Sequence, residues 1–171
     1  MSNFITRRGL LGTSAVAAAA MAATGRSLAA SRPANFARVF ISSNANTGNE
    51  IVAYGMSEAG ILSAIARYAT GGAGTSGGLG SQGAVTVSRN GRYLFTVNAG
   101  SGSLSAFRIN YDALELVSVV DSGGAMPTSV AEHGGLVYVL NAGGDGNVSG
   151  FRIRGGRLAP LDNSTRALST M

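Results

Sequence analysis

The sequence predicts an all-β fold built from repeated antiparallel sheets, and three observations indicate it. The first is an internal repeat, because Val97-Asn98-Ala99-Gly100 recurs as Leu140-Asn141-Ala142-Gly143 at a spacing of 43 residues. The second is a series of short runs that alternate apolar and polar residues and are rich in β-branched and aromatic side chains. The third is the 26 glycines among 171 residues, about twice the ordinary share of roughly 7%, which lie between these runs.

The repeated units each predict a set of short strands. The best-preserved unit predicts strands at residues 83–88, 92–98, 103–109 and 114–120, and Asn90 and Gly91 favour a tight hairpin between the first two. The next unit repeats them at residues 128–131, 136–141, 147–153 and 158–161, and a diverged upstream unit predicts three strands at 37–43, 50–56 and 62–68. A period of roughly 40 to 45 residues made of short strands is typical of a propeller blade. We therefore expect a partial β-propeller of about three blades of four-stranded sheet, the first blade lacking its inner strand.

The expected domain organisation has three parts. An export signal occupies residues 1–30, the incomplete propeller residues 36–161, and a truncated or irregular tail residues 162–171. The blades are expected at about 36–70, 83–121 and 127–161. Because closed propellers usually carry 4 to 8 blades, we expect the chain to be the N-terminal part of a longer protein or a truncated product.

The N-terminus predicts export. Arg7 and Arg8 precede an alanine-rich apolar run, and small residues near Ala29 and Ala30 suit a cleavage site. Paired arginines before such a run are typical of a Tat-type signal peptide. The run is shorter than the roughly 20 residues of a spanning helix, so we expect no stable membrane anchor after cleavage. The expected partner is the Tat export machinery, and the expected location is periplasmic or secreted.

Composition excludes several classes of function. The whole chain has 13 basic and 8 acidic residues, but three of the arginines lie in the leader, so the mature chain is nearly balanced and a nucleic-acid partner is not expected. There is no cysteine, which leaves stability to packing. We expect no cofactor and no metal.

The repeated strands also carry a family resemblance. Each unit has a tight turn, then an aromatic strand that ends in Asn, then a Ser-x-Phe or Gly-Phe strand, at residues 89–98 with 105–109 and at 132–141 with 149–153. This pattern resembles the lactonase family of seven-bladed propellers, which includes 6-phosphogluconolactonase and carboxymuconate cyclase. The resemblance implies hydrolysis of a lactone, as a carboxylic ester hydrolase, by the full-length protein. Members often carry a basic residue or histidine after a proline in the inner strand, whereas here Thr128 and Ser129 follow Pro127.

The candidate ligand site lies where the entrances to the inner strands meet the loops between the second and third strands. The residues at these places are Gln82, Asn98, Thr128, Asn141 and Asp145. The ligand implied is a small lactone or a sugar derivative, but opening a lactone needs a general base and donors for the oxyanion. No carboxylate–arginine pair in the sequence is assigned to that work, so the catalytic residues stay unassigned. Two alternatives remain open: a non-catalytic periplasmic binding or scaffold propeller, and an inactive truncated fragment.

Four further patterns favour structural interpretations. Residues 72–77 match G-x-G-x-x-G, but no helical period follows, which favours a loop between blades over a nucleotide site. His133, the single histidine, falls with Glu132 at a predicted hairpin turn. The glycine-rich segment 143–147 has one carboxylate, too few for a calcium site. Asn44, Asn98 and Asn141 are expected at one equivalent place in each unit, as residues that cap a turn.

Overall fold

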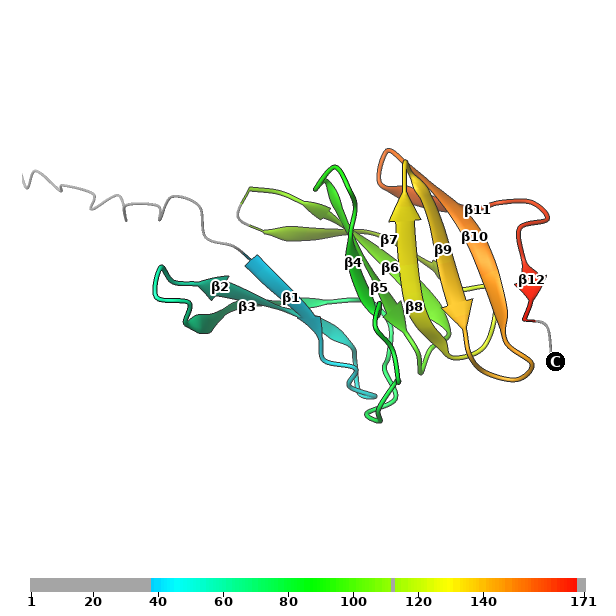
Figure 1. Ribbon diagram of the computed structural model, residues 1–171, viewed down its shortest axis with the longest axis horizontal. Coiled ribbons are helices and arrows are strands. Elements are labelled where there is room, and N and C mark those ends of the chain that lie inside the picture. Colours follow the sequence, from blue (N-terminus) through cyan, green and yellow to red (C-terminus); the bar gives the residue numbers. More distant parts are fainter. Residues whose placement is uncertain (1–37, 112, 169–171) are drawn as a thin grey trace, which may run out of the picture. The chain divides into compact units, whose positions relative to one another are not determined.

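The computed structural model describes residues 38–111 and 113–168 (Figure 1). The predicted export signal, including Arg7 and Arg8, lies outside the described residues. The described residues belong to one compact unit and form β-strands, turns and loops. Among them no helix is long and apolar enough to span a membrane.

The strands form three antiparallel sheets in chain order, as an all-β partial propeller requires. The first sheet has the order β1 (Arg38–Ser42), β2 (Glu50–Met56) and β3 (Leu62–Ala69). The second has the order β4 (Val85–Val87), β5 (Tyr93–Asn98), β6 (Ser103–Ile109) and β7 (Leu114–Asp121). The third has β8 (Pro127–His133), β9 (Leu136–Asn141), β10 (Asn147–Arg154) and β11 (Arg157–Pro160), and β12 (Arg166–Ala167) also pairs with β10.

The predicted fold class is confirmed, and the first sheet has three strands, as expected from its missing inner strand. Two details differ from the prediction: the strand β12 and the place of Asn44. The third sheet has an additional strand, β12, in a tail expected to be irregular. Asn44 is not equivalent to Asn98, because the backbone N–H of Ser43 donates to the carbonyl of Glu50 (2.9 Å). That bond makes Ser43 the partner of Glu50, as Asn98 is the partner of Ser103, so Asn44 lies one residue further along.

A β-bulge recurs at the equivalent place of the outer strand pair. In β3 the register skips Ile65, opposite Ala53, and in β7 it skips Val117, opposite Ala106. In the third sheet the outer strand is divided at this place into β11 and β12, and the hydroxyl of Ser164 bonds the backbone N–H and carbonyl of Gly150, both at 3.1 Å. β12 therefore takes the place of the second half of an outer strand, which is continuous as β3 and β7 in the other two sheets.

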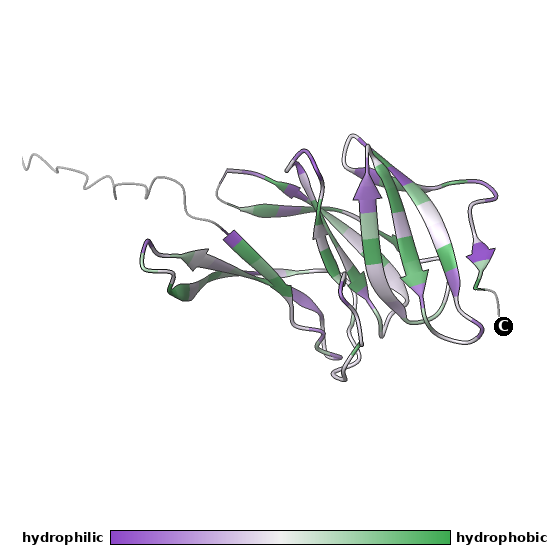
Figure 2. Cartoon of the chain, in the orientation of Figure 1, coloured by the Kyte–Doolittle hydropathy of each residue, from purple (hydrophilic) through white to green (hydrophobic). Residues whose placement is uncertain are grey.

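Hydrophobic residues recur along the strands of all three sheets (Figure 2). Because alternate side chains of a strand point to opposite faces, each sheet has apolar residues on both faces. We call the face toward the preceding sheet in the chain the leading face and the face toward the following sheet the trailing face. Register places equivalent residues at three positions on each face. The leading positions hold Val39, Tyr54 and Leu62 in the first sheet, Leu94, Phe107 and Leu114 in the second, and Val137, Phe151 and Leu158 in the third. The trailing positions hold Phe40, Ile51 and Tyr68, then Phe95, Leu104 and Val120, then Tyr138, Val148 and Arg166.

The two hydrophobic clusters of the described chain lie where these faces meet. The smaller cluster joins the trailing positions of the first sheet to the leading positions of the second, with Ile51 and Leu94 both fully buried. The larger cluster joins the trailing positions of the second sheet to the leading positions of the third, with Phe95, Val137 and Phe151 at 2% exposure or less. The core is thus a stack of sheet interfaces built from the same positions each time, which is the packing expected of successive propeller blades.

Candidate functional site

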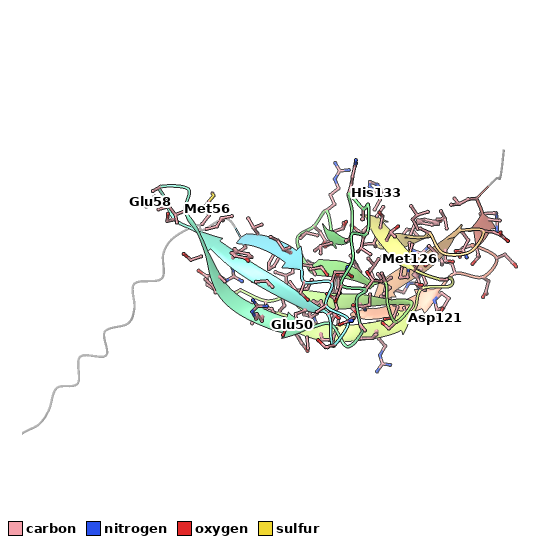
Figure 3. The ribbon with its side chains drawn as sticks, turned by 90° about the horizontal axis from the view of Figure 1, so that it is seen from below. Glu50, Met56, Glu58, Asp121, Met126 and His133 are labelled. Carbon is pink, nitrogen blue, oxygen red and sulfur yellow. The ribbon has the colours of Figure 1, made fainter. Side chains whose placement is uncertain are left out.

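The long loops of the described chain gather at one end of the sheets, where β1, β5 and β9 end and β6 and β10 begin. We call this the loop end, and it comprises residues 43–49, 70–84, 99–102, 122–126 and 142–146. The opposite end, which we call the turn end, holds the hairpin turns at 57–61, 88–92, 134–135 and 155–156. Figure 3 shows the separation, with Glu50 and Glu58 at opposite ends of the hairpin formed by β2 and β3.

Asn98 fastens the first sheet to the second at the loop end. Its side-chain carbonyl accepts hydrogen bonds from Asn49 Nδ2 (3.0 Å) and Thr70 Oγ1 (2.7 Å), both from the first sheet. Its Nδ2 donates to Ser103 Oγ (3.0 Å) and Ser105 Oγ (2.8 Å) in its own sheet. An asparagine side chain has two donors and two acceptor lone pairs, so these four bonds use its whole capacity. With Asn98 fully buried, the geometry gives it a structural role.

Asn141 holds the equivalent place between the second and third sheets, with one difference. Its Nδ2 donates to the carbonyl of Ser122 (3.1 Å) and to Asn147 Oδ1 (2.8 Å). Its own Oδ1 is buried and has no hydrogen-bond partner among the described residues. Gly102 directly precedes β6, as Asn49 directly precedes β2 in the first sheet. Glycine has no side chain, so the amide donor that Asn49 supplies at the first boundary is missing at the second. The second boundary is therefore the less complete of the two.

A repeated quartet carries the chain from one sheet to the next. Thr70-Gly71-Gly72-Ala73 follows β3, and Ser122-Gly123-Gly124-Ala125 follows β7. The spacing of 52 residues between the two quartets is visible in the sequence and is a signal that the predicted strands and turns did not use. The first glycine of each has a positive φ, +77° and +78°. A Cβ on the second glycine would lie 2.5 Å from Asn98 Cγ in the first quartet and 2.6 Å from Asn147 Nδ2 in the other, so only glycine lets the chain pass this close.

The entrances to the inner strands β4 and β8 lie side by side. Ser81 Oγ and Ser129 Oγ lie 3.0 Å apart, and the backbone N–H of Val130 donates to the carbonyl of Gly83 (2.8 Å). Gln82, between Ser81 and Gly83, is exposed.

The other predicted site residues are divided between two places. Thr128 is buried and lies in the bulge beside the Pro127–Asn141 pair. Asp145 is exposed in the 142–146 loop, whereas Asn98 belongs to the other sheet boundary. Ligand binding by the five predicted residues stays a prediction: Gln82, Asn98, Thr128, Asn141 and Asp145.

The glycine-rich loop at residues 72–77 has no N–H group left to hold a phosphate. Its six backbone N–H groups donate, in order, to Thr70 Oγ1, Ser101 Oγ, the carbonyl of Ala45, Asn44 Oδ1, the carbonyl of Asn44 and Thr75 Oγ1. No helix follows the loop among the described residues. A phosphate-binding loop instead points free N–H groups at its ligand, so the interpretation of this segment as a connecting loop agrees with its geometry.

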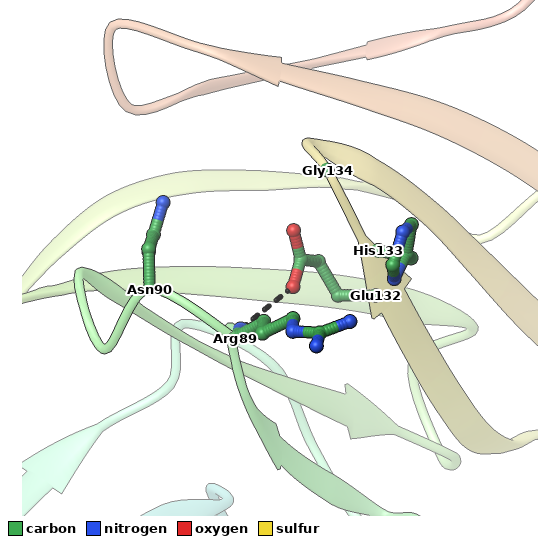
Figure 4. Close-up of a pocket in the computed structure, with 5 residues that line it drawn as sticks. All are labelled: Arg89, Asn90, Glu132, His133 and Gly134. Atoms are coloured by element: carbon green, nitrogen blue, oxygen red, sulfur yellow. Dashed lines mark hydrogen bonds between the residues drawn. The ribbon is translucent and has the colours of Figure 1, made fainter.

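His133 lies at the turn end, as its place in the repeat predicts. Arg89, Asn90, Glu132, His133 and Gly134 line a shallow hollow of about 350 Å³ (Figure 4). Glu132 Oε2 accepts from the backbone N–H of Arg89 (3.0 Å), and Oε1 accepts from the backbone N–H of Gly135 (2.8 Å). Glu132 therefore joins the hairpin turns of neighbouring sheets, and its carboxylate is occupied by backbone bonds rather than paired with His133.

The described residues contain no group of three or more His, Cys, Asp or Glu side chains that could hold a metal ion. A second hollow, of about 590 Å³, opens at the loop end of the first sheet. Its lining includes Thr47, Asn49 and Glu50, of which Asn49 bonds to Asn98 and Glu50 forms an exposed ion pair with Arg67 (3.1 Å). The loop end thus offers mostly uncharged hydrogen-bonding groups.

Comparison with known proteins decides the family. A family model described as lactonase, 7-bladed β-propeller, matches residues 45–170. The chain belongs to this lactonase family. No curated protein sequence matches it.

Solved structures show the same fold. A functionally unknown protein from Desulfotomaculum acetoxidans has a TM-score of 0.55 at 19% identity, over 76% of this chain and 42% of that chain. A protein from Lactobacillus plantarum has a TM-score of 0.55 at 19% identity, over 70% and 39%. The periplasmic gluconolactonase of Pseudomonas aeruginosa has a TM-score of 0.54 at 22% identity, over 73% and 37%. The lactonase-family chain described here thus spans about two fifths of the length of these structures.

Proposed function

We propose that the chain forms three blades of an exported lactonase-type propeller that hydrolyses a small, sugar-derived lactone at its loop end. The observation that carries the proposal is the family match over residues 45–170. The fold that the chain shares with the periplasmic gluconolactonase of Pseudomonas aeruginosa supports both the substrate class and the location. The twin arginines Arg7 and Arg8 support export.

The chemistry of the proposed reaction defines what the loop end must supply. The oxygen of a water molecule bonds to the lactone carbonyl carbon, the ring C–O bond breaks, and the ring oxygen takes a proton, which gives a hydroxy acid. A general base must accept the water's proton, and hydrogen-bond donors must hold the negative charge that develops on the carbonyl oxygen.

We assign Asp145 to the base and Gln82 and Thr128 to the sugar hydroxyls. Asp145 is exposed at the loop end, and its carboxylate accepts no hydrogen bond from the described residues. Gln82 is exposed directly before β4, and Thr128 lies at the start of β8. A small number of polar side chains is the usual means of orienting a small ligand in its site.

The test is acid release from glucono-1,5-lactone and related lactones by the purified full-length protein, measured at constant pH against the uncatalysed background. We expect catalysed release, and we expect Asp145→Asn to lower it at least tenfold. Glu58→Gln is the matched control, because Glu58 is an exposed carboxylate at the turn end and its loss leaves the loop end intact. Background rates across the whole panel would contradict the proposal.

A binding propeller is the second candidate. The pair Thr128-Ser129 after Pro127 favours it, because family members often have a basic residue or histidine at this place. Saturable binding of the same lactones without acid release would support it.

A further inference from the structure

The hollow at the turn end, which we call the turn-end hollow, is formed by two neighbouring inner hairpin turns. Arg89 and Asn90 belong to the turn between β4 and β5, and Glu132, His133 and Gly134 lie at the end of β8 and in the turn after it. Because the first sheet has no inner strand, two such turns meet in the described chain only at the boundary of the second and third sheets. Both sheets are described, so the hollow lies between sheets of the stack and not on its outer faces.

Arg89 supplies a charged donor to the turn-end hollow. The residue is exposed and belongs to neither of the two ion pairs found among the described residues. Its backbone N–H donates to Glu132 Oε2 at 3.0 Å, which fixes the start of the side chain against the neighbouring turn. A guanidinium forms two parallel N–H···O bonds with a carboxylate. The hollow therefore offers a binding group for the acid of a ligand.

Glu132 and Asn90 supply groups that suit hydroxyls. Each carboxylate oxygen of Glu132 accepts one backbone N–H, and an ionised carboxylate has about four lone-pair sites, so about half of them remain for hydroxyl donors. Asn90 Oδ1 accepts from Ser88 Oγ (2.9 Å) and from the backbone N–H of Arg92 (3.0 Å), which leaves its Nδ2 as the donor to a ligand. In the view of Figure 4, Glu132 lies between Asn90 and His133.

From this set of groups we infer that the turn-end hollow binds a small hydroxy acid. The ligand's carboxylate accepts from Arg89, one of its hydroxyls donates to Glu132, and another accepts from Asn90 Nδ2. The volume of about 350 Å³ lies at the lower end of the range for small-molecule sites, roughly 300–1,000 Å³, and suits a ligand of this size.

Other classes of ligand match the groups less well. An anion without hydroxyls, such as phosphate, has no proton to donate to Glu132 and lies beside its negative charge. A neutral sugar leaves the guanidinium of Arg89 without a charged partner. A ligand that carries both a carboxylate and hydroxyls satisfies Arg89 and Glu132 together, so the inference names this class.

Nuclear magnetic resonance titration of the purified protein with gluconate tests the inference, with glucose and inorganic phosphate as the neutral and the purely anionic probes. We expect gluconate to give saturable shifts of the backbone amides of Asn90 and Gly134, and the other two probes to bind more weakly by about tenfold or more. Arg89→Gln removes the charged donor, and we expect it to weaken gluconate binding by about tenfold or more.

Arg92→Gln is the matched control. Arg92 is an exposed arginine of the same turn as Arg89 and is not among the residues that line the hollow. We expect this variant to keep the dissociation constant of gluconate within about twofold of the parent's. Amide shifts outside the turn that match the parent spectrum establish that both variants fold.

Gluconate shifts that do not saturate, or saturable shifts confined to loop-end amides such as those of Gln82 and Gly124, would overturn the inference. So would parent-like binding by Arg89→Gln, or an equal loss from Arg92→Gln. Binding of phosphate or glucose as tight as that of gluconate would also overturn it. The inference goes beyond the proposed function, although a hydroxy acid is also the class of product that the proposed reaction releases. None of these outcomes depends on acid release from a lactone.

Discussion

The hydroxyl of Thr70 donates a hydrogen bond to the side-chain carbonyl of Asn98 at 2.7 Å, and this bond links the first residue after β3 to the second sheet. The same carbonyl accepts from Asn49. Two sheets that share no backbone ladder are thus joined by one buried amide. The described chain depends on such amides and on apolar faces, because it has no cysteine to link its sheets.

Replacing Asn98 should destabilise the protein strongly. Asn98→Ala removes four hydrogen bonds. One N–H of Asn49 loses its acceptor while the other keeps the carbonyl of Val97, and the Thr70 hydroxyl keeps the carbonyl of Asn49. The expected cost is about 2–4 kcal/mol. Urea unfolding measures the change. Asn110→Ala is the control, since Asn110 is exposed and surface changes stay within about 0.5 kcal/mol. Equal effects of the two substitutions would contradict the assigned role.

Asn141→Ala should cost less than Asn98→Ala, although the two residues are equally buried. Asn141 makes two side-chain hydrogen bonds, and its buried Oδ1 lacks a partner among the described residues. The substitution therefore removes the unfavourable free energy of that unpaired oxygen together with the two bonds. We expect a difference of about 1–2 kcal/mol between the two variants under the same urea protocol. A larger loss from Asn141→Ala would mean that its Oδ1 has a partner in solution.

The second glycine of each quartet should tolerate no side chain. Gly72→Ala and Gly124→Ala each place a Cβ within 3 Å of buried asparagine atoms, and we expect about 1–3 kcal/mol of destabilisation from the forced shift. Gly78→Ala is the matched control, because a Cβ there meets nothing within 4 Å and its φ is not positive. The thermal midpoints of the three variants decide the matter, and a wild-type midpoint for Gly72→Ala would refute the close approach.

Phe95 and Tyr138 occupy the same position of the repeat, but Phe95 is fully buried and Tyr138 is partly exposed. Phe95→Ala should cost about 3–5 kcal/mol, because the ring is fully buried in the larger cluster. Tyr138→Ala should cost about 1 kcal/mol, because its ring is 41% exposed. Urea unfolding measures both changes. Similar losses would indicate that Tyr138 is covered within a single chain.

Export should depend on the paired arginines rather than on positive charge alone. Lysine keeps the charge but lacks the planar guanidinium, so the double variant Arg7→Lys, Arg8→Lys should leave the protein in the cytoplasm of a Tat-competent host. Cell fractionation compares it with the parent leader. Continued export of the double variant would contradict a Tat-type signal.

The strands could be predicted from sequence because side chains alternate along them and apolar residues recur on both faces of each sheet. The bounds of β2, β6 and β9 agree with their predicted ranges. The place of Asn44 could not be predicted from sequence. The similarity of residues 43–45 to residues 97–99 aligns Asn44 with Asn98, whereas the hydrogen bond from Ser43 to Glu50 aligns Ser43 with Asn98.

The candidate site was less accessible to sequence reasoning. The recurrence of Asn98 and Asn141 was visible, but their partners Asn49 and Thr70 lie 49 and 28 residues away from Asn98, and only the fold brings them together. β12 was missed because two residues show no alternation, and a two-residue strand depends on the edge that β10 offers.

Cross-sheet proton contacts in solution test the stacking of repeated faces most directly. With protein labelled at its methyl groups and phenylalanine rings, nuclear Overhauser effects are expected between Ile51 and the leading residues Leu94, Phe107 or Leu114, and between Phe95 and Val137 or Phe151. Observation of both sets would establish that successive sheets pack through equivalent positions. Ile51 and Phe95 signals that lack these partners, in a chain that is otherwise folded, would contradict the account.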